Sequence, residues 1–315
     1  MATLNLIKSI YKYKFDSPCL LILHQLNNSR MNLYSINTGF FKLDGGAMFG
    51  VVPKALWERT NPSDSNNMCN WAMRSLLIED GNRLILIDTG IGNKQTDKFF
   101  SHYFLHGDAS LAGSLKNHGF SVDDITDVLL THLHFDHCGG SIEWANKEKT
   151  ILEPVFKNAK FWSNENHWNW ATTPNNREKA SFLSDNIQPI KESGQLNFIE
   201  RKARTTSGVF NNIDVFFADG HTESQMIPII QYKQYKIAFM ADLLPSVGHI
   251  PLPYVMGYDT RPLLTLDEKQ AFLNLAAENN FILFLEHDPI NECCTVKKTE
   301  KGVRLKECLK LRDLL

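Results

Sequence analysis

The sequence lacks any hydrophobic run long enough to cross a bilayer. A membrane-spanning helix needs about 18 or more consecutive apolar residues, whereas the first marked apolar run extends only from Cys19 to Leu23. This run is also short for the core of a signal peptide, and no small-x-small cleavage site follows it. We therefore expect a protein that does not bind membranes, and we place it in the cytoplasm.

Paired cysteines and an excess of either charge are lacking as well. The six cysteines form no Cys-x-x-Cys pair, and Cys293 and Cys294 are adjacent, a spacing that rarely closes an ordinary disulfide. Reduced thiols, as in a cytoplasm, are the simplest interpretation. The formal net charge is −2 and no basic stretch stands out, so the sequence does not support a nucleic-acid partner.

The composition is that of an ordinary globular protein, with 315 residues of which 43% are hydrophobic and 22% are charged. From Met31 onward, segments typical of strands alternate with turns, and Asp80-Gly81 is a strong hairpin signal. We expect a further strand from Met48 to Val52, a helix near residues 177–186, and an amphipathic helix over residues 266–279. Thr265 and Glu268 are expected to cap that last helix.

Residues 127–140 contain four candidate metal ligands directly after one apolar run. At a strand's period of two, His132 and His134 leave the end of the run pointing the same way, as two imidazoles on one ion would. Gly139-Gly140 permits a tight turn, so the residues just before it lie on a bend and can reach a second ion. Those residues are Asp136 and His137.

Five predicted strands deliver a polar side chain near their C-terminal ends. Polar groups gathered at strand ends are where an α/β fold places its chemistry. The five runs and the polar residues that follow them are Leu84–Ile87 before Asp88, Val128–Leu130 before His132, Ile213–Phe217 before Asp219-Gly220-His221, Lys236–Ala241 before Asp242, and Phe281–Leu285 before Glu286-His287-Asp288.

The stretch His-Leu-His-Phe-Asp-His, residues 132–137, resembles the His-x-His-x-Asp-His signature of the metallo-β-lactamase-fold metallohydrolases. With Phe135 before the Asp and Gly139-Gly140 after the motif, it is most similar to the branch that includes N-acyl-homoserine lactonases and methyl parathion hydrolase. The resemblance covers residues 31 to about 290 and implies an α/β protein built as a four-layer αββα sandwich. Residues 1–30 are then expected to be an N-terminal extension, and residues 31–315 the hydrolase domain.

The resemblance also implies a set of metal ligands and a bound metal. Neutral imidazoles with a few carboxylates suit zinc, iron or manganese better than calcium or magnesium. We expect two divalent transition-metal ions per chain, with zinc as the first choice. The implied ligands are His132, His134 and His221 on one ion, Asp136, His137 and His287 on the other, and Asp242 bridging both, with Asp88 orienting a ligand histidine.

The expected activity is dinuclear, metal-dependent hydrolysis of an ester-like bond in a small molecule, with a lactone as first choice. A metal-bridging hydroxide would attack the carbonyl, and Asp242 or Asp136 would pass a proton to the leaving alkoxide. Phosphotriester hydrolysis is the alternative on the same site. A phosphodiesterase or nuclease, a flavodiiron-type redox protein and a non-catalytic metal-binding protein are less favoured. If the chain associates with itself, we expect a homodimer.

The proline-rich stretch from Leu243 to Pro262 is expected to shape the substrate site, because long loops in compact domains commonly bind ligands. A packed connector is the alternative. Lactonases of this branch often carry a Tyr three residues after the bridging Asp, where this chain has Pro245. Another phenol must then assist the substrate carbonyl, and Tyr254 is our choice. The expected substrate-binding residues are Phe135, His249, Tyr254 and Tyr258.

Two further groups of residues near these motifs have structural interpretations. The acidic neighbours of His287, Glu286 and Asp288, are expected to contact solvent or backbone rather than metal. The aromatic stretch between residues 143 and 204 is expected to pack over the sheet, with a substrate cleft as the alternative. It includes Trp162, His167, Trp168 and Trp170.

Overall fold

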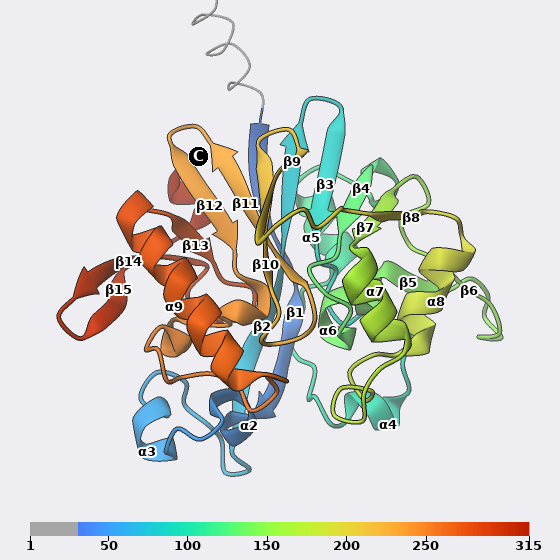
Figure 1. Cartoon of the computed structure of the whole chain (residues 1–315). Coiled ribbons are helices and arrows are strands. Elements are labelled where there is room, and N and C mark those ends of the chain that lie inside the picture. The colour runs from blue at the N-terminus through green and yellow to red at the C-terminus, as the bar shows by residue number, and fades with distance from the viewer. Residues whose placement is uncertain (1–30, 315) are drawn as a thin grey trace, which may run out of the picture.

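The computed structural model describes residues 31–314, so the expected extension over residues 1–30 lies outside the described residues. Two mixed β-sheets stack at the centre, and helices cover the outer face of each (Figure 1). The predicted α/β class and four-layer αββα sandwich are confirmed. The six-stranded sheet has the order β1 (Met31–Asp44), β2 (Met68–Asp80), β3 (Arg83–Ile87), β4 (Asp127–Leu129), β7 (Lys160–Ser163) and β8 (Leu196–Phe198).

The second sheet has seven strands and comes mainly from the second half of the chain. β12 and β13 run parallel, while the other neighbouring pairs are antiparallel. Its order is β15 (Gly302–Leu309), β14 (Cys293–Thr299), β13 (Ile282–Phe284), β12 (Tyr235–Phe239), β11 (Gln225–Tyr232), β10 (Ile213–Ala218) and β9 (Thr205–Phe210). A separate hairpin joins β5 (Ile142–Trp144) to β6 (Leu152–Pro154).

The helices form two outer layers and a group at one end of the sandwich (Figure 1). α5 (Leu111–Asn117), α7 (Glu165–Thr172) and α8 (Ser184–Glu192) cover the first sheet, and α9 (Pro262–Asn279) covers the second. The short helices are α2 (Gly45–Phe49), α3 (Lys54–Trp57), α4 (Asp97–Phe100) and α6 (Phe135–Cys138), with 3-10 turns η1 (Val122–Asp124), η2 (Gly139–Ser141), η3 (Ala241–Leu243), η4 (Val247–His249) and η5 (Leu311–Leu314).

The alternation of side chains along β2 explains why its sequence is an unbroken apolar run. Leu76 and Ile78 pack between the two sheets, whereas Leu77 points to the other face and packs with residues of the helix layer. All three side chains are buried. Because each sheet is covered on both faces, both sets of positions must be apolar, and a two-residue period does not show in the sequence.

The strand ends that carry polar residues meet at one end of the sandwich. β3 and β4 are parallel neighbours, as are β12 and β13, so the segments that follow them emerge at the same edge. All five runs predicted as strands are strands in the structure: β3, β4, β10, β12 and β13. The hairpin at Asp80-Gly81 also forms, with Asp80 opposite Arg83. This convergence brings the candidate ligands together around α6, which contains Asp136 and His137 and lies a little below the middle of the molecule in Figure 1.

Three local predictions were wrong. No strand forms from Met48 to Val52: Met48 and Phe49 end the helix α2, and residues 50–52 form a turn. The first turn of α2 is capped by Asp44, which accepts a hydrogen bond from the Ala47 amide at 2.8 Å. The helix expected near residues 177–186 is α8, which begins only at Ser184. α9 begins at Pro262, a favourable first position for proline. Glu268 caps no helix and instead accepts from the amides of Asp219 and Gly220.

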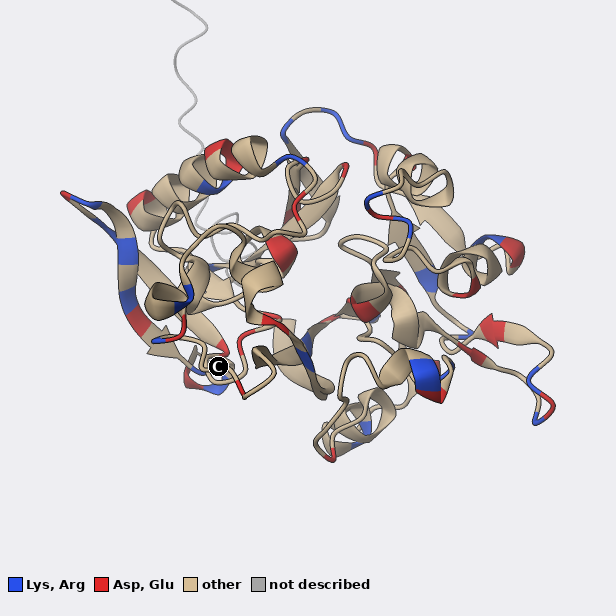
Figure 2. Cartoon of the chain, turned by 90° about the horizontal axis from the view of Figure 1, so that it is seen from below, with Lys and Arg blue, Asp and Glu red and all other residues tan. Residues whose placement is uncertain are grey.

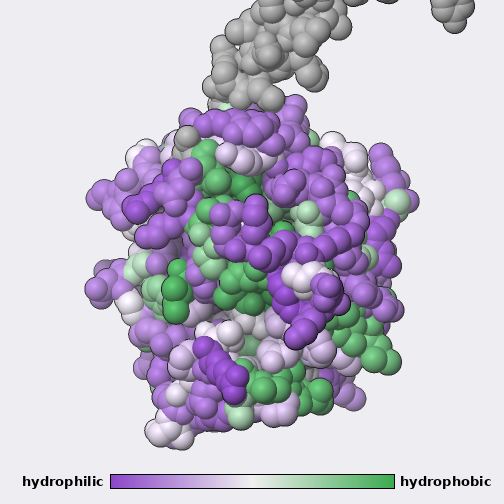
Figure 3. Space-filling view, turned by 90° about the vertical axis from the view of Figure 1, so that its left-hand side faces the viewer, coloured by the Kyte–Doolittle hydropathy of each residue, from purple (hydrophilic) through white to green (hydrophobic). Residues whose placement is uncertain are grey.

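The surface is mixed in charge, and apolar side chains reach it in places. Lys, Arg, Asp and Glu are interspersed around the lower end, with several cations on the β14–β15 hairpin (Figure 2). On the side that faces the viewer in Figure 3, apolar atoms lie among polar ones, and a groove of about 290 Å³ between α9 and β15 is lined in part by Leu252, Leu273 and Val303. Within residues 31–314 no helix is long and apolar enough to cross a membrane, and the cysteines are free thiols.

The contact between the Gly139-Gly140 turn and the loop after β3 generates a stability prediction. A Cβ atom on Gly140 would lie 2.2 Å from the carbonyl oxygen of Thr89, a backbone atom that cannot move aside cheaply. We expect Gly140→Ala to lower the free energy of unfolding by about 1–3 kcal/mol, measured by urea denaturation. Gly113→Ala in α5 is the control, because its Cβ would meet only the movable Ser110 side chain. Equal stability of the two variants would contradict this account.

Candidate metal centre

The first cluster of ligand atoms comes from three strand ends. His132 and His134 follow β4, His221 follows β10 and Asp242 follows β12, and one ligand atom from each lies within 4.8 Å of the others. The Nε2 atom of His221 lies 3.2 Å from Nδ1 of His134 and 3.0 Å from Oδ2 of Asp242. All four side chains are buried. His132 and His134 thus lie together as predicted, but both are in the loop after β4, which ends at Leu129, and a strand's period does not direct them.

The second cluster lies directly beside the first and shares Asp242 with it. One ligand atom each from Asp136, His137 and His287 falls within 4.8 Å of the others. The Nε2 atoms of His137 and His287 are 3.2 Å apart, and Oδ1 of Asp242 lies 3.1 Å from Nε2 of His287. The Oδ2 atom of Asp242 lies 3.6 Å from Nε2 of both His132 and His137, so this carboxylate contacts histidines of both clusters.

These separations fit bound transition-metal ions. Ligand atoms held about 2.0–2.1 Å from a tetrahedral ion lie about 3.3 Å from one another. The distances from Asp242 oxygens to histidine nitrogens fall between 3.0 and 3.6 Å. Within residues 31–314, Nε2 of His132 and Oδ1 of Asp242 are buried without any hydrogen-bond partner. Buried polar atoms of this kind are costly unless something binds them, and the donor set suits zinc, iron or manganese.

The electrostatics of the cluster favour a bound cation as well. Burial, together with the nearby imidazoles, holds the pKa of His132 well below its usual value. Burial acts in the same direction on His221 and His287, but the Asp242 carboxylate raises the pKa of His221 to about 10 and that of His287 to about 9. Without metal ions, His221 and His287 would thus both carry an extra proton and a positive charge inside the same buried cluster. Metal ions would supply the same positive charge without those protons.

The two histidines of the second cluster each have a partner on the outer side of the ring. Oδ2 of Asp88 lies 3.0 Å from Nδ1 of His137, and the same carboxylate accepts from the Thr131 amide at 2.8 Å and the Thr131 hydroxyl at 2.6 Å. Nδ1 of His287 contacts the Ala72 carbonyl at 2.8 Å. These contacts leave the Nε2 atoms of His137 and His287 free to face the cluster. The structure thus places Asp88 where an orienting carboxylate would act.

Two further carboxylates contact the outer side of ligand histidines, and the sequence did not reveal either of them. Oδ1 of Asp259, in the loop before α9, lies 3.0 Å from Nδ1 of His221, and no local pattern marks it. Glu286 is fully buried, with Oε2 at 3.1 Å from Nδ1 of His137, so the expectation that it contacts solvent or backbone was wrong. Asp288 does contact backbone, accepting from the amides of Val247, Ile290 and Asn291.

A pocket of about 340 Å³ opens over the two clusters. Candidate ligands from both clusters form its floor, and its walls carry apolar and aromatic side chains together with one cation, Arg177. Burial raises the pKa of Tyr103 to about 12, with Asp136 adding to the effect, so the phenol keeps its proton at neutral pH. The wall residues include Leu43, Met48, Tyr103, Phe135, Met256 and Tyr258.

The loop from Leu243 to Pro262 contributes to this pocket in part. Of the four residues expected to bind substrate, Tyr258 of this loop and Phe135 of α6 line the pocket, whereas His249 and Tyr254 do not. The His249 ring stacks on Phe49 with centroids 4.4 Å apart, and its two nitrogens contact Ser246 Oγ and the Met48 carbonyl. Tyr254 packs edge-on against the same Phe49 ring. These two side chains lie in the aromatic cluster behind the pocket wall.

The aromatic side chains of residues 143–204 pack as expected and do not line the pocket, although Arg177, Glu178, Ala180 and Ser181 of the same stretch do. Trp168 is buried among core residues of the helix layer, and Trp162 and Trp170 pack against core clusters. His167 is also fully buried, and it has a positioning role that the sequence did not reveal. Its Nε2 accepts from the Leu133 amide at 2.8 Å, and its Nδ1 contacts the Glu223 carbonyl at 2.6 Å. It therefore ties the loop of His132 and His134 to that of His221.

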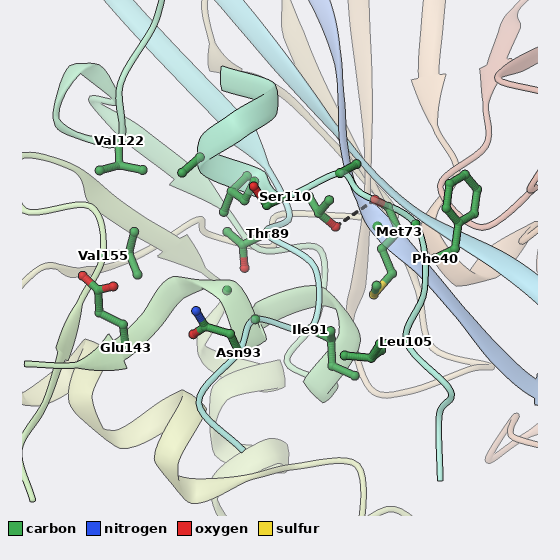
Figure 4. Close-up of a pocket in the computed structure, with 18 of the residues that line it drawn as sticks. Phe40, Met73, Thr89, Ile91, Asn93, Leu105, Ser110, Val122, Glu143 and Val155 are labelled. Carbon is green, nitrogen blue, oxygen red and sulfur yellow. Dashed lines mark hydrogen bonds between the residues drawn. The ribbon is translucent and has the colours of Figure 1, made fainter. Parts of the chain in front are cut away.

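A second cavity, of about 440 Å³, lies on the other side of the loop after β3. Thr89, Ile91 and Asn93 of that loop point into it, with Met73 and Phe40 at one end and Glu143 at the other (Figure 4). The Thr89 hydroxyl bonds the His137 carbonyl oxygen at 3.0 Å. This cavity holds neither candidate metal cluster, and its wall supports the metal loop from behind.

Known proteins share this fold and part of this sequence. The family model described as the metallo-beta-lactamase superfamily matches residues 74–287. A probable metal-dependent hydrolase from Staphylococcus aureus is 27% identical, with a TM-score of 0.77 over 89% of this chain and 99% of that one. AidC, a dizinc quorum-quenching lactonase, is 22% identical, with a TM-score of 0.72 over 89% of this chain and 95% of that one. AbOPH, a hydrolase of the beta-lactamase superfamily, is 18% identical, with a TM-score of 0.71 over 90% and 96%.

The chain therefore belongs to the metallo-beta-lactamase superfamily, as its His-x-His-x-Asp-His motif predicted. The expectation that it is a metal-dependent hydrolase is confirmed at the level of that class.

The buried lysine of α9 generates a prediction about the pocket wall. The ammonium group of Lys269 donates to the carbonyls of His249 at 3.0 Å and Tyr254 at 2.7 Å, and so holds the loop that leads to Tyr258. We expect Lys269→Met to lower the free energy of unfolding by about 1–3 kcal/mol, because buried carbonyls lose their donor. Urea denaturation measures this loss, with the exposed Lys191→Met as control. A Lys269→Met protein as stable as the control would show that the anchor is dispensable.

Proposed function

We propose that this protein is a dinuclear metal-dependent hydrolase of ester-like bonds and that its substrate is a lactone. The observation that carries the proposal is the pocket whose floor contains Asp242, the carboxylate that faces both clusters. An apolar cavity above a pair of metal positions suits a small, neutral carbonyl compound. It offers little to a polyanion, since Arg177 is the one cation among the lining residues within the described chain.

The proposed ligand set is the one implied by the sequence motif. His132, His134 and His221 would hold one ion, His137, His287 and Asp136 the other, and Asp242 would contact both. Two such ions, with zinc as first choice, would supply a hydroxide at neutral pH and polarise the oxygen of the bond being broken. The structural neighbours support a pair of zinc ions, because they include a dizinc lactonase. They also include a lactonase whose product is bound at the catalytic metal centre.

The protein's own residues would then bind and orient the substrate and move its proton. Asp136 and Asp242 are both at the pocket floor, each about a tenth exposed, so either carboxylate can reach a leaving alkoxide. Tyr258 replaces Tyr254 as our candidate phenol for the substrate carbonyl, because Tyr258 lines the pocket and Tyr254 does not. The apolar side chains of Leu43, Met48 and Met256 would contact the body of the substrate.

Phosphotriester hydrolysis remains the second candidate. A triester is neutral, so the same apolar walls and the same floor would accept it, and a hydrolase named AbOPH is among the structural neighbours. A panel of lactones, aryl esters, phosphotriesters and phosphodiesters separates these activities. The homodimer and the cytoplasmic location stay predictions.

Metal removal is the direct test of the proposed centre. We expect chelation to abolish hydrolysis and two zinc ions per chain to restore it. Asp242→Ala should lower kcat by at least about 10³-fold, because a carboxylate that touches both positions is lost and the two cations are less screened. Metal analysis and steady-state kinetics measure these effects, with the exposed Asp267→Ala as control. One ion or none in an active enzyme would overturn the dinuclear proposal.

The two tyrosines of the loop test how the substrate is held. Tyr258→Phe removes a phenol that lines the pocket and should lower kcat on lactones by about 10²-fold to 10³-fold, the usual scale for one lost transition-state hydrogen bond. Tyr254→Phe changes a phenol outside the lining and should leave kcat near the wild-type value. A larger effect from Tyr254 than from Tyr258 would reverse the assignment.

A further inference from the structure

Glu178 is a buried carboxylate that the proposed chemistry does not use. It lies in the turns between α7 and α8, it is only 3% exposed, and it lines the pocket over the metal clusters. Its two oxygens have different surroundings. Oε2 accepts hydrogen bonds from Trp170 Nε1 and Asn175 Nδ2, both at 2.7 Å. That side of the carboxylate is therefore fixed.

The other oxygen faces a candidate metal ligand. Oε1 of Glu178 lies 3.4 Å from Nε2 of His134, the ring nitrogen that points away from the first cluster. Both atoms are buried and neither has a hydrogen-bond partner within residues 31–314. When Nδ1 of His134 binds an ion, Nε2 must carry the proton, because a neutral imidazole has only one. Oε1 is then the acceptor available to that proton.

The segment that carries Glu178 is also hydrogen-bonded to a second segment of the pocket wall, the one that contains Gly257 and Tyr258. Arg177 donates to the carbonyls of Gly257 and Asp259, the latter at 3.1 Å. The Asp259 side chain in turn contacts Nδ1 of His221, a histidine of the first cluster whose Nε2 lies 3.2 Å from Nδ1 of His134. Two wall segments, linked to each other, thus each present a carboxylate to one histidine of the same cluster.

We propose that Glu178 is a positioning residue that holds His134 in the tautomer and orientation needed for the first ion, and so couples the pocket wall to the metal centre. The proposal rests on the proposed function for the presence of the ion, and on the geometry above for the role of Glu178. Carboxylate partners of this kind fix the ring orientation of a metal-binding histidine and raise its basicity.

The test measures zinc binding to the metal-free protein by competition with a chromophoric chelator, in the absence of any substrate. We expect Glu178→Ala to weaken one of the two zinc ions by roughly 10-fold to 100-fold, with the other ion retained. At saturating zinc, KM on a lactone should change less than kcat, since His134 rather than the apolar wall is disturbed. Unchanged affinity for both ions in Glu178→Ala would overturn the proposal.

Asn175→Ala is the matched control, because Asn175 holds the same carboxylate and caps the same turn without touching His134. If Glu178 only stabilises the turn, both variants should lose thermal stability equally and keep both ions, which would also overturn the proposal. Glu178→Gln serves if the Ala variant does not fold. An amide can offer its oxygen to His134 or to the Trp170 and Asn175 donors but not to both, so we expect an intermediate loss of zinc affinity.

Because zinc affinity is read without substrate, the outcomes for the two proposals differ. A wild-type protein that binds two zinc ions but cleaves no lactone would refute the proposed substrate and leave the role of Glu178 standing. An active wild-type enzyme whose Glu178→Ala variant holds zinc equally well would refute the role of Glu178 alone.

Discussion

The burial of the Asp242 carboxylate among four imidazoles is the constraint on which this end of the molecule depends. Burial would raise the pKa of Asp242, but His221, His137 and His287 hold it well below its usual range. An ionised carboxylate in such a place is tolerated only when opposite charge is close on every side. The fold meets this demand by ending strands of both sheets at the same edge, so that Asp242 from one sheet lies between histidines from both.

Holding these residues requires unusual backbone at the strand ends. Asp88 and Ala241, directly after β3 and just before Asp242, have φ values of 56° and 40°, in the left-handed region that favours glycine. Each such residue costs of order 1–3 kcal/mol and persists only when its surroundings enforce it. For Asp88 the surroundings are visible, since its carboxylate accepts from Thr131 and contacts His137. The same residue thus turns the chain and orients a candidate ligand.

The parts that the sequence predicted well are those governed by local rules. His132 and His134 belong to one short motif, and both reach the same cluster from the loop that follows β4, which ends at Leu129. Glu178 and Asp259 could not be found in this way, because they lie 44 and 38 residues from the histidines they contact. The apolar segment from Met48 to Val52 was misread for a related reason. Met48 and Phe49 end the helix α2 and pack with Trp57 and Trp71, whereas Val51 in the turn after them is exposed, so packing by distant aromatic residues overrides a local β pattern.

The separation between ligands and wall residues has a consequence for specificity. The candidate ligands follow strands, where the two sheets fix their positions, whereas Tyr103, Ser181 and Tyr258 of the wall come from three different connecting segments. Loops accept substitutions that a sheet core does not. The wall can therefore change to admit another neutral substrate, but only within limits set by Glu178 and Asp259, whose carboxylates bind the wall segments to His134 and His221. A substitution in these segments that shifts either carboxylate would alter the metal centre along with the pocket.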